Sequence, residues 1–164
     1  MYQWLVFLHI LGVFGFLLAH GAATAVSFSL RNEREIPRIR AWLDLSRSAE
    51  SVANISLLVL LAAGIAAGIM GNWWGHLWIW TALGLLVLMS VSMFVLGSRP
   101  FNQLRMLVQR SESMREKQEG VLAMNKFAEE QLAPLLKATH PLSLTVIGGG
   151  GLALILWLML FKPF

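Results

Sequence analysis

The stretch YQWLVFLHILGVFGFLLAHGAATAVSFSL, residues 2–30, decides the fold of this chain of 164 residues. It contains no Lys, Arg, Asp or Glu, and it exceeds the roughly 20 apolar residues that a helix needs to cross a bilayer. We therefore predict a membrane span over about residues 3–28. A cleaved signal peptide is the alternative, but it would have a basic start and a shorter apolar core.

The remaining charges are few and segregated. Only 13% of the residues are charged, against about 25% in soluble domains. Every Asp and Glu lies in residues 31–50 or 99–137, and residues 51–98 and 138–161 carry no charge. The chain is therefore predicted to be one all-α integral membrane domain, an antiparallel bundle of four transmembrane helices. The spans are expected at about residues 3–28, 52–70, 77–97 and 141–161.

The basic residues predict the orientation. Five of the 13 lie in the connection 31–50 and seven in the connection 99–139, whereas only Lys162 follows the last span. By the positive-inside rule both connections are cytoplasmic and both termini lie outside. Six tryptophans fall near the predicted outer surface, as an aromatic belt would: Trp4, Trp73, Trp74, Trp78, Trp80 and Trp157.

The connections and composition add further expectations. Pro37 and nearby polar residues predict a short surface helix over Ile36 to Leu45, lying against the membrane. Pro141 is well placed to begin the last helix. The absence of cysteine excludes disulfides and thiolate metal sites. A net charge of +4 is no argument for nucleic-acid binding, because the basic residues flank spans, where they meet lipid headgroups.

Glycines mark where the spans approach other groups. Gly64 and Gly68 form a GxxxG step, which lets membrane helices pack closely. Four consecutive glycines, residues 148–151, lie in the last span. They indicate either close helix packing, or room for a flat ligand or a local break in the helix.

Two histidines lie inside the first span. His9 and His20 are 11 residues apart, so they differ by only about 20° around the helix and by about 16 Å along it. An ionisable residue at that depth is a functional hypothesis by default. Gly12, Phe16 and Ala23 fall on the same side, and a face with imidazole beside small residues suits haem b. A proton relay, or simple hydrogen bonding of each ring to a neighbour, is the alternative.

The remaining candidates are weaker. A bis-histidine haem needs a second imidazole at equal depth, and His76 and His140 are the two available. Both fall at span ends, so an interfacial position is the simpler expectation for each. Met89 and Met93 share a helical face but are typical of packing. Glu50 is either a second-shell partner of His20 or a solvated acid at a helix start.

The run FLHILGVFGFLLAHGA, followed by an arginine-rich connection and three more spans, resembles bacterial four-helix membrane proteins of the CopD and HemJ-like group. The resemblance covers about residues 2–110, and His9, Gly12 and Gly15 carry it. It implies a bacterial inner-membrane protein that handles haem or copper. The chain departs from the HemJ-like pattern in residues 22–30 and in having no lysine within a span, so the oxidase activity of that group does not carry over, and no copper ligands are transferred.

Two functions follow from the sequence. The first is a small haem-binding or redox-associated membrane protein that uses His9 and His20. The second is a non-catalytic accessory or structural subunit of a larger respiratory, photosynthetic or transport complex, or a homo-oligomer. No hydrolase motif, phosphate-binding loop or zinc signature indicates another chemistry.

Overall fold

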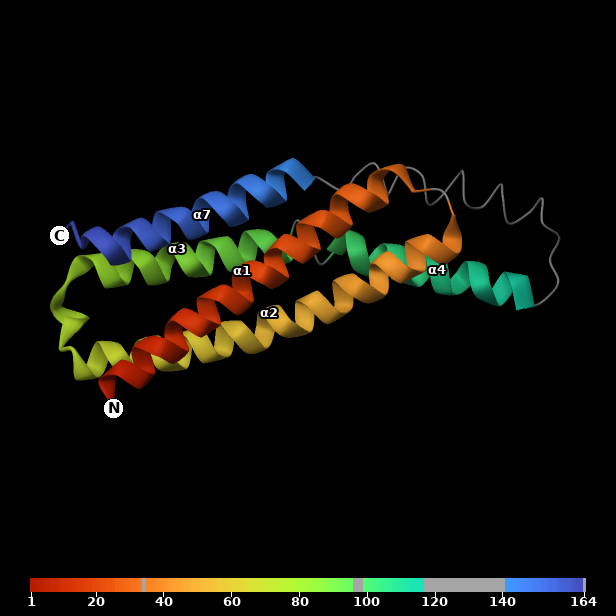
Figure 1. Ribbon diagram of the computed structural model, residues 1–164. Helices are drawn as coiled ribbons and strands as arrows, with labels where there is room; N and C mark the ends of the chain where they lie inside the picture. Colours follow the sequence, from red (N-terminus) through yellow and green to blue (C-terminus); the bar gives the residue numbers. More distant parts are fainter. Residues whose placement is uncertain (34, 96–98, 117–140, 164) are drawn as a thin grey trace.

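A computed structural model describes residues 1–33, 35–95, 99–116 and 141–163. These residues form helices and contain no strand. In chain order the elements are α1 (Tyr2–Asn32), α2 (Ile36–Met70), the 3₁₀ turn η1 (Trp73–Gly75), α3 (Leu77–Met93), α4 (Arg99–Glu116) and α7 (Pro141–Phe161). Figure 1 shows α1, α2, α3 and α7 running side by side, with α4 beyond the end of α3 and next to the start of α2.

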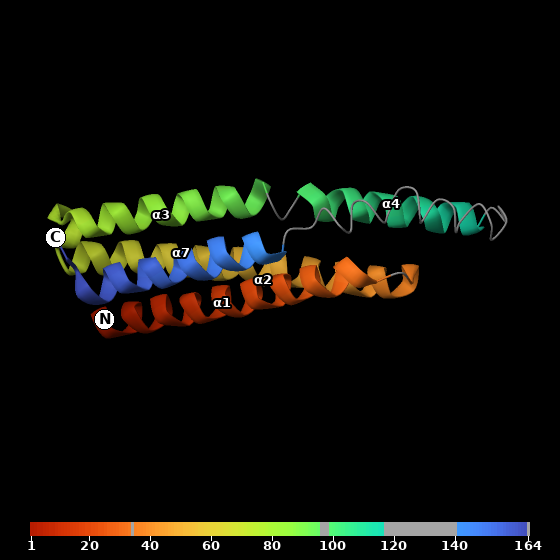
Figure 2. The same ribbon diagram turned by 90° about the horizontal axis from the view of Figure 1, so that it is seen from above.

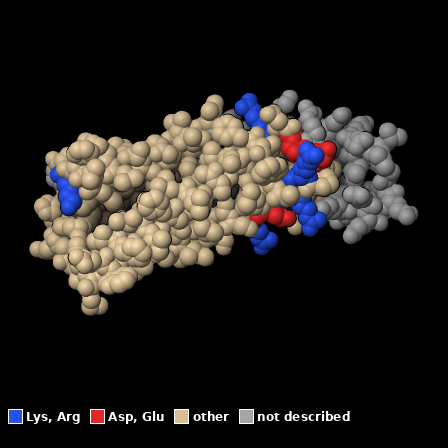
Figure 3. All heavy atoms as spheres, in the orientation of Figure 1, with Lys and Arg blue, Asp and Glu red and all other residues tan. Residues whose placement is uncertain are grey.

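Three helices are long and apolar enough to cross a membrane, namely Tyr2–Asn32, Ile36–Met70 and Leu142–Phe161. The fourth, α3, is apolar but shorter, with 17 residues. The described charges lie almost entirely at one end of the molecule, and the middle of the visible face carries none (Figure 3). This is the surface expected of an integral membrane protein, because hydrocarbon cannot solvate charged side chains.

The core has two parts. The first, in the middle of the helices, is formed by residues of α2, α3 and α7, among them Leu60, Leu86 and Leu152, with Phe16 of α1 packed against it. The second lies at the charged end, where the end of α1, the start of α2 and α4 meet. Its fully buried members include Leu30, Ile39 and Leu104. Figure 2 shows α4 continuing past the end of α3 on this side.

The helix α2 differs from the expectation. The sequence predicted a separate surface helix over residues 36–45 and a span that starts near residue 52, but the two are one continuous helix. Pro37 does begin the helix, and nothing after it breaks the backbone. The apolar side chains Ile39 and Leu43 are buried in the protein, so they do not lie on the membrane surface. With 35 residues, α2 is about 52 Å long, well beyond the roughly 30 Å of a hydrocarbon core.

The contact between α1 and α2 is the most extensive one among the described helices. A Cβ atom at Gly12 would lie 2.8 Å from the backbone nitrogen of Leu60, and one at Gly15 would overlap the hydroxyl of Ser56. Because backbone cannot move aside as a side chain can, Gly12 has to be glycine for the helices to meet at this distance. Ala63 and Ala67 of α2 are also buried.

The end opposite the charges is aromatic. Tyr2 packs edge-on against Trp73 with ring centroids 6.0 Å apart, and Trp73 lies 5.9 Å from Trp78. The ammonium of Lys162 sits 4.5 Å above the Trp73 ring. Asn72 makes the preceding turn in the left-handed conformation, with φ of 54°. Both chain termini lie at this end, together with Trp73 and Trp78 (Figure 1).

The glycines of the last span do not break it. The helix α7 begins at Pro141, as predicted, and runs without interruption through residues 148–151. A Cβ atom at Gly151 would meet the sulfur of Met89 at 3.1 Å, whereas Gly149 and Gly150 have no atom within 4 Å of that position. Gly148 also contacts neighbouring side chains, namely His20 and Met93. Close helix packing therefore accounts for Gly148 and Gly151, two of the four glycines.

Candidate functional site

His9 connects α1 to α2 through a hydrogen bond. Its Nδ1 lies 2.8 Å from the backbone oxygen of Leu60. A carbonyl oxygen only accepts, so Nδ1 carries the proton and donates it. The other ring nitrogen, Nε2, then keeps its lone pair. This is the tautomer in which a histidine binds a metal through Nε2.

The ring of His9 lies over Gly64. A Cβ atom at Gly64 would be 2.8 Å from Nδ1 and 3.0 Å from Cε1 of His9. The other glycine of the GxxxG step, Gly68, faces Trp74 and Ile79. Both glycines of the predicted GxxxG motif therefore take part in packing, and the first of them, Gly64, contacts the imidazole of His9.

His20 faces a different helix. A Cβ atom at Gly148 of α7 would overlap both the His20 ring, at Cε1 and Nε2, and the terminal methyl of Met93 from α3. His20 and Met93 thus converge on one glycine. The two histidines share a side of α1 by helical period, yet one contacts α2 and the other α7. The reason is that α1 runs obliquely across the bundle, so it comes close to α7 over part of its length while it packs on α2 (Figure 1).

The residues between the histidines bear on the haem hypothesis. Gly12 is covered by Leu60 of α2, and Phe16 packs against the core in the middle of the helices, so these two positions of the expected haem face contact protein. Ala23 contributes its carbonyl, which accepts a hydrogen bond from Ser27 Oγ at 3.1 Å. A haem at His9 would have to bind at Nε2, away from this contact. Within the described ranges, no group of three or more His, Asp or Glu residues could hold a metal ion.

The other predicted residues are dispersed. His76 is exposed at the start of α3, and its backbone N–H donates to Trp73 O at 3.0 Å. His140 lies outside the described residues. Glu50 is exposed and lies 3.7 Å from Nη1 of Arg105, so its ion-pair partner is on α4. The predicted haem and metal ligands stay predictions.

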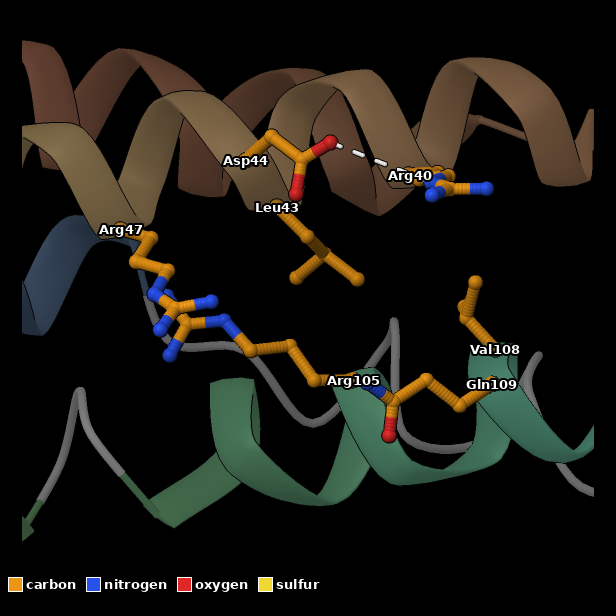
Figure 4. Close-up of a pocket in the computed structure, with 7 residues that line it drawn as sticks. All are labelled: Arg40, Leu43, Asp44, Arg47, Arg105, Val108 and Gln109. Atoms are coloured by element: carbon orange, nitrogen blue, oxygen red, sulfur yellow. Dashed lines mark ion pairs between the residues drawn. The ribbon is translucent and has the colours of Figure 1, made fainter.

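A pocket at the charged end was not predicted from the sequence. It has a volume of about 230 Å³ between α2 and α4 (Figure 4). Its lining residues are Arg40, Leu43, Asp44, Arg47, Arg105, Val108 and Gln109. The signal was present in the spacing of Arg40, Asp44 and Arg47 at i, i+4 and i+7 on one helix face. This spacing alone does not predict a pocket, because the other side of the pocket is formed by α4.

Arg105 holds the two helices together at this pocket. Its Nη2 donates to Ser46 Oγ at 2.9 Å, and its Nη1 donates to Asn102 Oδ1 at 3.0 Å. Its Nε is buried without a hydrogen-bond partner. The guanidinium is therefore fixed in place but not fully satisfied.

Comparisons of the chain with protein-family models, curated proteins and solved structures gave no match.

The contact between His9 and Gly64 generates a prediction. Gly64→Ala should lower the free energy of unfolding by about 1–3 kcal/mol, because the new methyl overpacks the imidazole. In the His9→Ala background, where that space is vacant, the same change should be near neutral. Reversible unfolding in detergent measures the coupling energy of this double-mutant cycle. Equal costs of Gly64→Ala in both backgrounds would contradict the contact.

Proposed function

We propose that this protein is a four-pass integral membrane protein of a bacterial cytoplasmic membrane, with both termini on the outer side. The apolar part of α2 and the helices α1, α3 and α7 are the spans. Two observations support this orientation: the described arginines lie at the end away from the termini, and the ring contacts of Tyr2, Trp73 and Trp78 lie at the end with them. At 17 residues α3 reaches the lower limit for a span.

Labelling of single cysteines tests the orientation, since the natural chain contains none. Gln3 and Ser48 are exposed near opposite ends of the spans. A membrane-impermeant maleimide should label Gln3→Cys in intact spheroplasts and Ser48→Cys only after permeabilisation. Labelling of Ser48→Cys before permeabilisation would contradict the proposed orientation.

Within this frame the best-supported function is that of a non-catalytic accessory subunit that packs against other membrane helices. The supporting observation is the division of the glycines into two sets. In the first set, the space beside each glycine is occupied by neighbouring groups of the same chain, including both intramembrane histidines. This set contains Gly12, Gly15, Gly64 and Gly148. Gly21 and Gly149 have no atom within 4 Å of a Cβ position.

The open glycines suit contact with another helix. Gly21 is followed at i+4 by exposed Ala25, and Gly149 at i+4 by exposed Ala153. Two small residues four apart let a second membrane helix approach closely, and in lipid such packing drives association. The pairs flank the contact of His20 with Gly148. A partner helix, from another subunit or a second copy, would lie along this side of α1 and α7.

Substitution of the open glycines tests the accessory role. Gly21→Leu and Gly149→Leu should leave the chain folded, because the space at each Cβ is open, and should reduce the size of the assembly extracted in mild detergent to that of the single chain. Gly84→Leu, on α3, is the matched control, as Gly84 is equally open. Native electrophoresis measures the size. A wild-type chain that already runs as a monomer would contradict the proposal.

A redox role at the histidines is the second candidate, and one observation favours it. The hydrogen bond from His9 Nδ1 to Leu60 O fixes the tautomer whose Nε2 can bind haem iron. Haem would supply electron transfer when bound, and the protein would supply the oriented imidazole.

The absorption spectrum separates the two functions. The accessory role predicts that protein purified in mild detergent has no Soret band, oxidised or reduced. The redox role predicts a Soret and an α band that disappear in His9→Ala or His20→Ala and persist in His76→Ala, where the histidine is exposed at a helix start. A band that survives all three changes would contradict both histidine assignments.

A further inference from the structure

The pocket between α2 and α4 has an excess of positive charge. Of its lining residues, Arg40, Arg47 and Arg105 are basic and Asp44 alone is acidic. The carboxylate of Asp44 lies 3.9 Å from Nε of Arg40, so it partly neutralises Arg40 rather than Arg47 or Arg105. Glu50 lies 3.7 Å from Arg105 but is not among the lining residues.

Two of these arginines face each other. In Figure 4 the guanidinium groups of Arg47 and Arg105 reach the same place from α2 and α4. The side chain of Arg105 is only 24% exposed, and Arg47 has no ion pair among the described residues. Like charges that line one pocket repel each other, and an anion bound between them would relieve that repulsion.

The position of the pocket identifies the kind of anion. Arg47 precedes the start of the charge-free stretch of α2, near residue 52, by five residues, which is about 8 Å along a helix. The headgroup layer of a bilayer extends about 5–8 Å beyond the hydrocarbon on each side. This spacing puts Arg47 within the headgroup layer when the charge-free stretch of α2 spans the hydrocarbon. Leu43 and Val108 give the same pocket an apolar wall.

We propose that this pocket binds the phosphate group of an anionic lipid headgroup. Arg47 and Arg105 donate charge-assisted hydrogen bonds to the phosphate oxygens. A volume of about 230 Å³ holds a phosphate group together with several waters. The site goes beyond the accessory role and is independent of the histidines, so it holds for either function proposed above.

Titration of the full-length protein in uncharged detergent tests the site. Short-chain phosphatidylglycerol should bind more tightly than phosphatidylcholine of the same chain length. Arg47→Gln should weaken phosphatidylglycerol binding about ten-fold or more, the loss expected for a charge-assisted hydrogen bond. Asp44→Asn should strengthen binding, because it removes the carboxylate from the lining. Calorimetry measures each affinity, and unfolding curves confirm that each variant is folded.

Arg38→Gln is the control for net charge. Arg38 is also an exposed arginine of α2, but it pairs with Glu35 at 2.9 Å and does not line the pocket. Equal weakening by Arg38→Gln and Arg47→Gln would overturn the site in favour of general surface charge. Inorganic phosphate, titrated alone, distinguishes the source of the group. Arg47-dependent binding of inorganic phosphate without any preference for phosphatidylglycerol would overturn the lipid assignment.

Discussion

The near contact of two backbones inside the membrane is the constraint on which this structure depends. Lipid tails are as apolar as leucine, so burial of apolar side chains does not drive helices together there, and close packing has to replace it. Gly12 against the backbone of Leu60 supplies that contact. The hydrogen bond from His9 to the Leu60 carbonyl is made one turn away on α1, and it is possible only because the backbones are already close. The helices α3 and α7 pack against each other and share a core with α2.

The close contact of α1 and α2 allows the His9 ring to be hydrogen-bonded inside the membrane without a bound cofactor. An imidazole in hydrocarbon has to satisfy its N–H, and a carbonyl of the adjacent helix does so at 2.8 Å. Gly64 makes room for one ring and Gly148 for the other. Each polar ring is therefore matched to a glycine on a neighbouring helix. Packing and ligation are not exclusive, since the same hydrogen bond leaves Nε2 of His9 with its lone pair.

The sequence predicts the helices well and their neighbours poorly. Uncharged stretches and Pro141 locate α1, α3 and α7, because solvation by lipid acts on each segment separately. The sequence did not predict that α2 is continuous. The apolar residues Ile39 and Leu43 give the same sequence pattern whether they contact lipid or pack against α4. The partners of His9 and His20 depend on the oblique course of α1, which no local pattern encodes. The arginine pocket is lined by residues of α2 and of α4, and even the nearest two across it, Arg47 and Arg105, are 58 positions apart in the sequence. The pocket therefore exists only because α4 packs against α2.

The unbroken course of α2 has a mechanical consequence. A helix of 35 residues behaves as a stiff rod over about 52 Å, and its two halves lie in different media. Membrane helices adjust their tilt when the bilayer becomes thinner or thicker. Any such tilt of the apolar half swings the basic half through the opposite arc, and α4 moves with it through Arg105 and Ser46. A change in membrane thickness is thereby converted into a displacement at the charged end of the molecule.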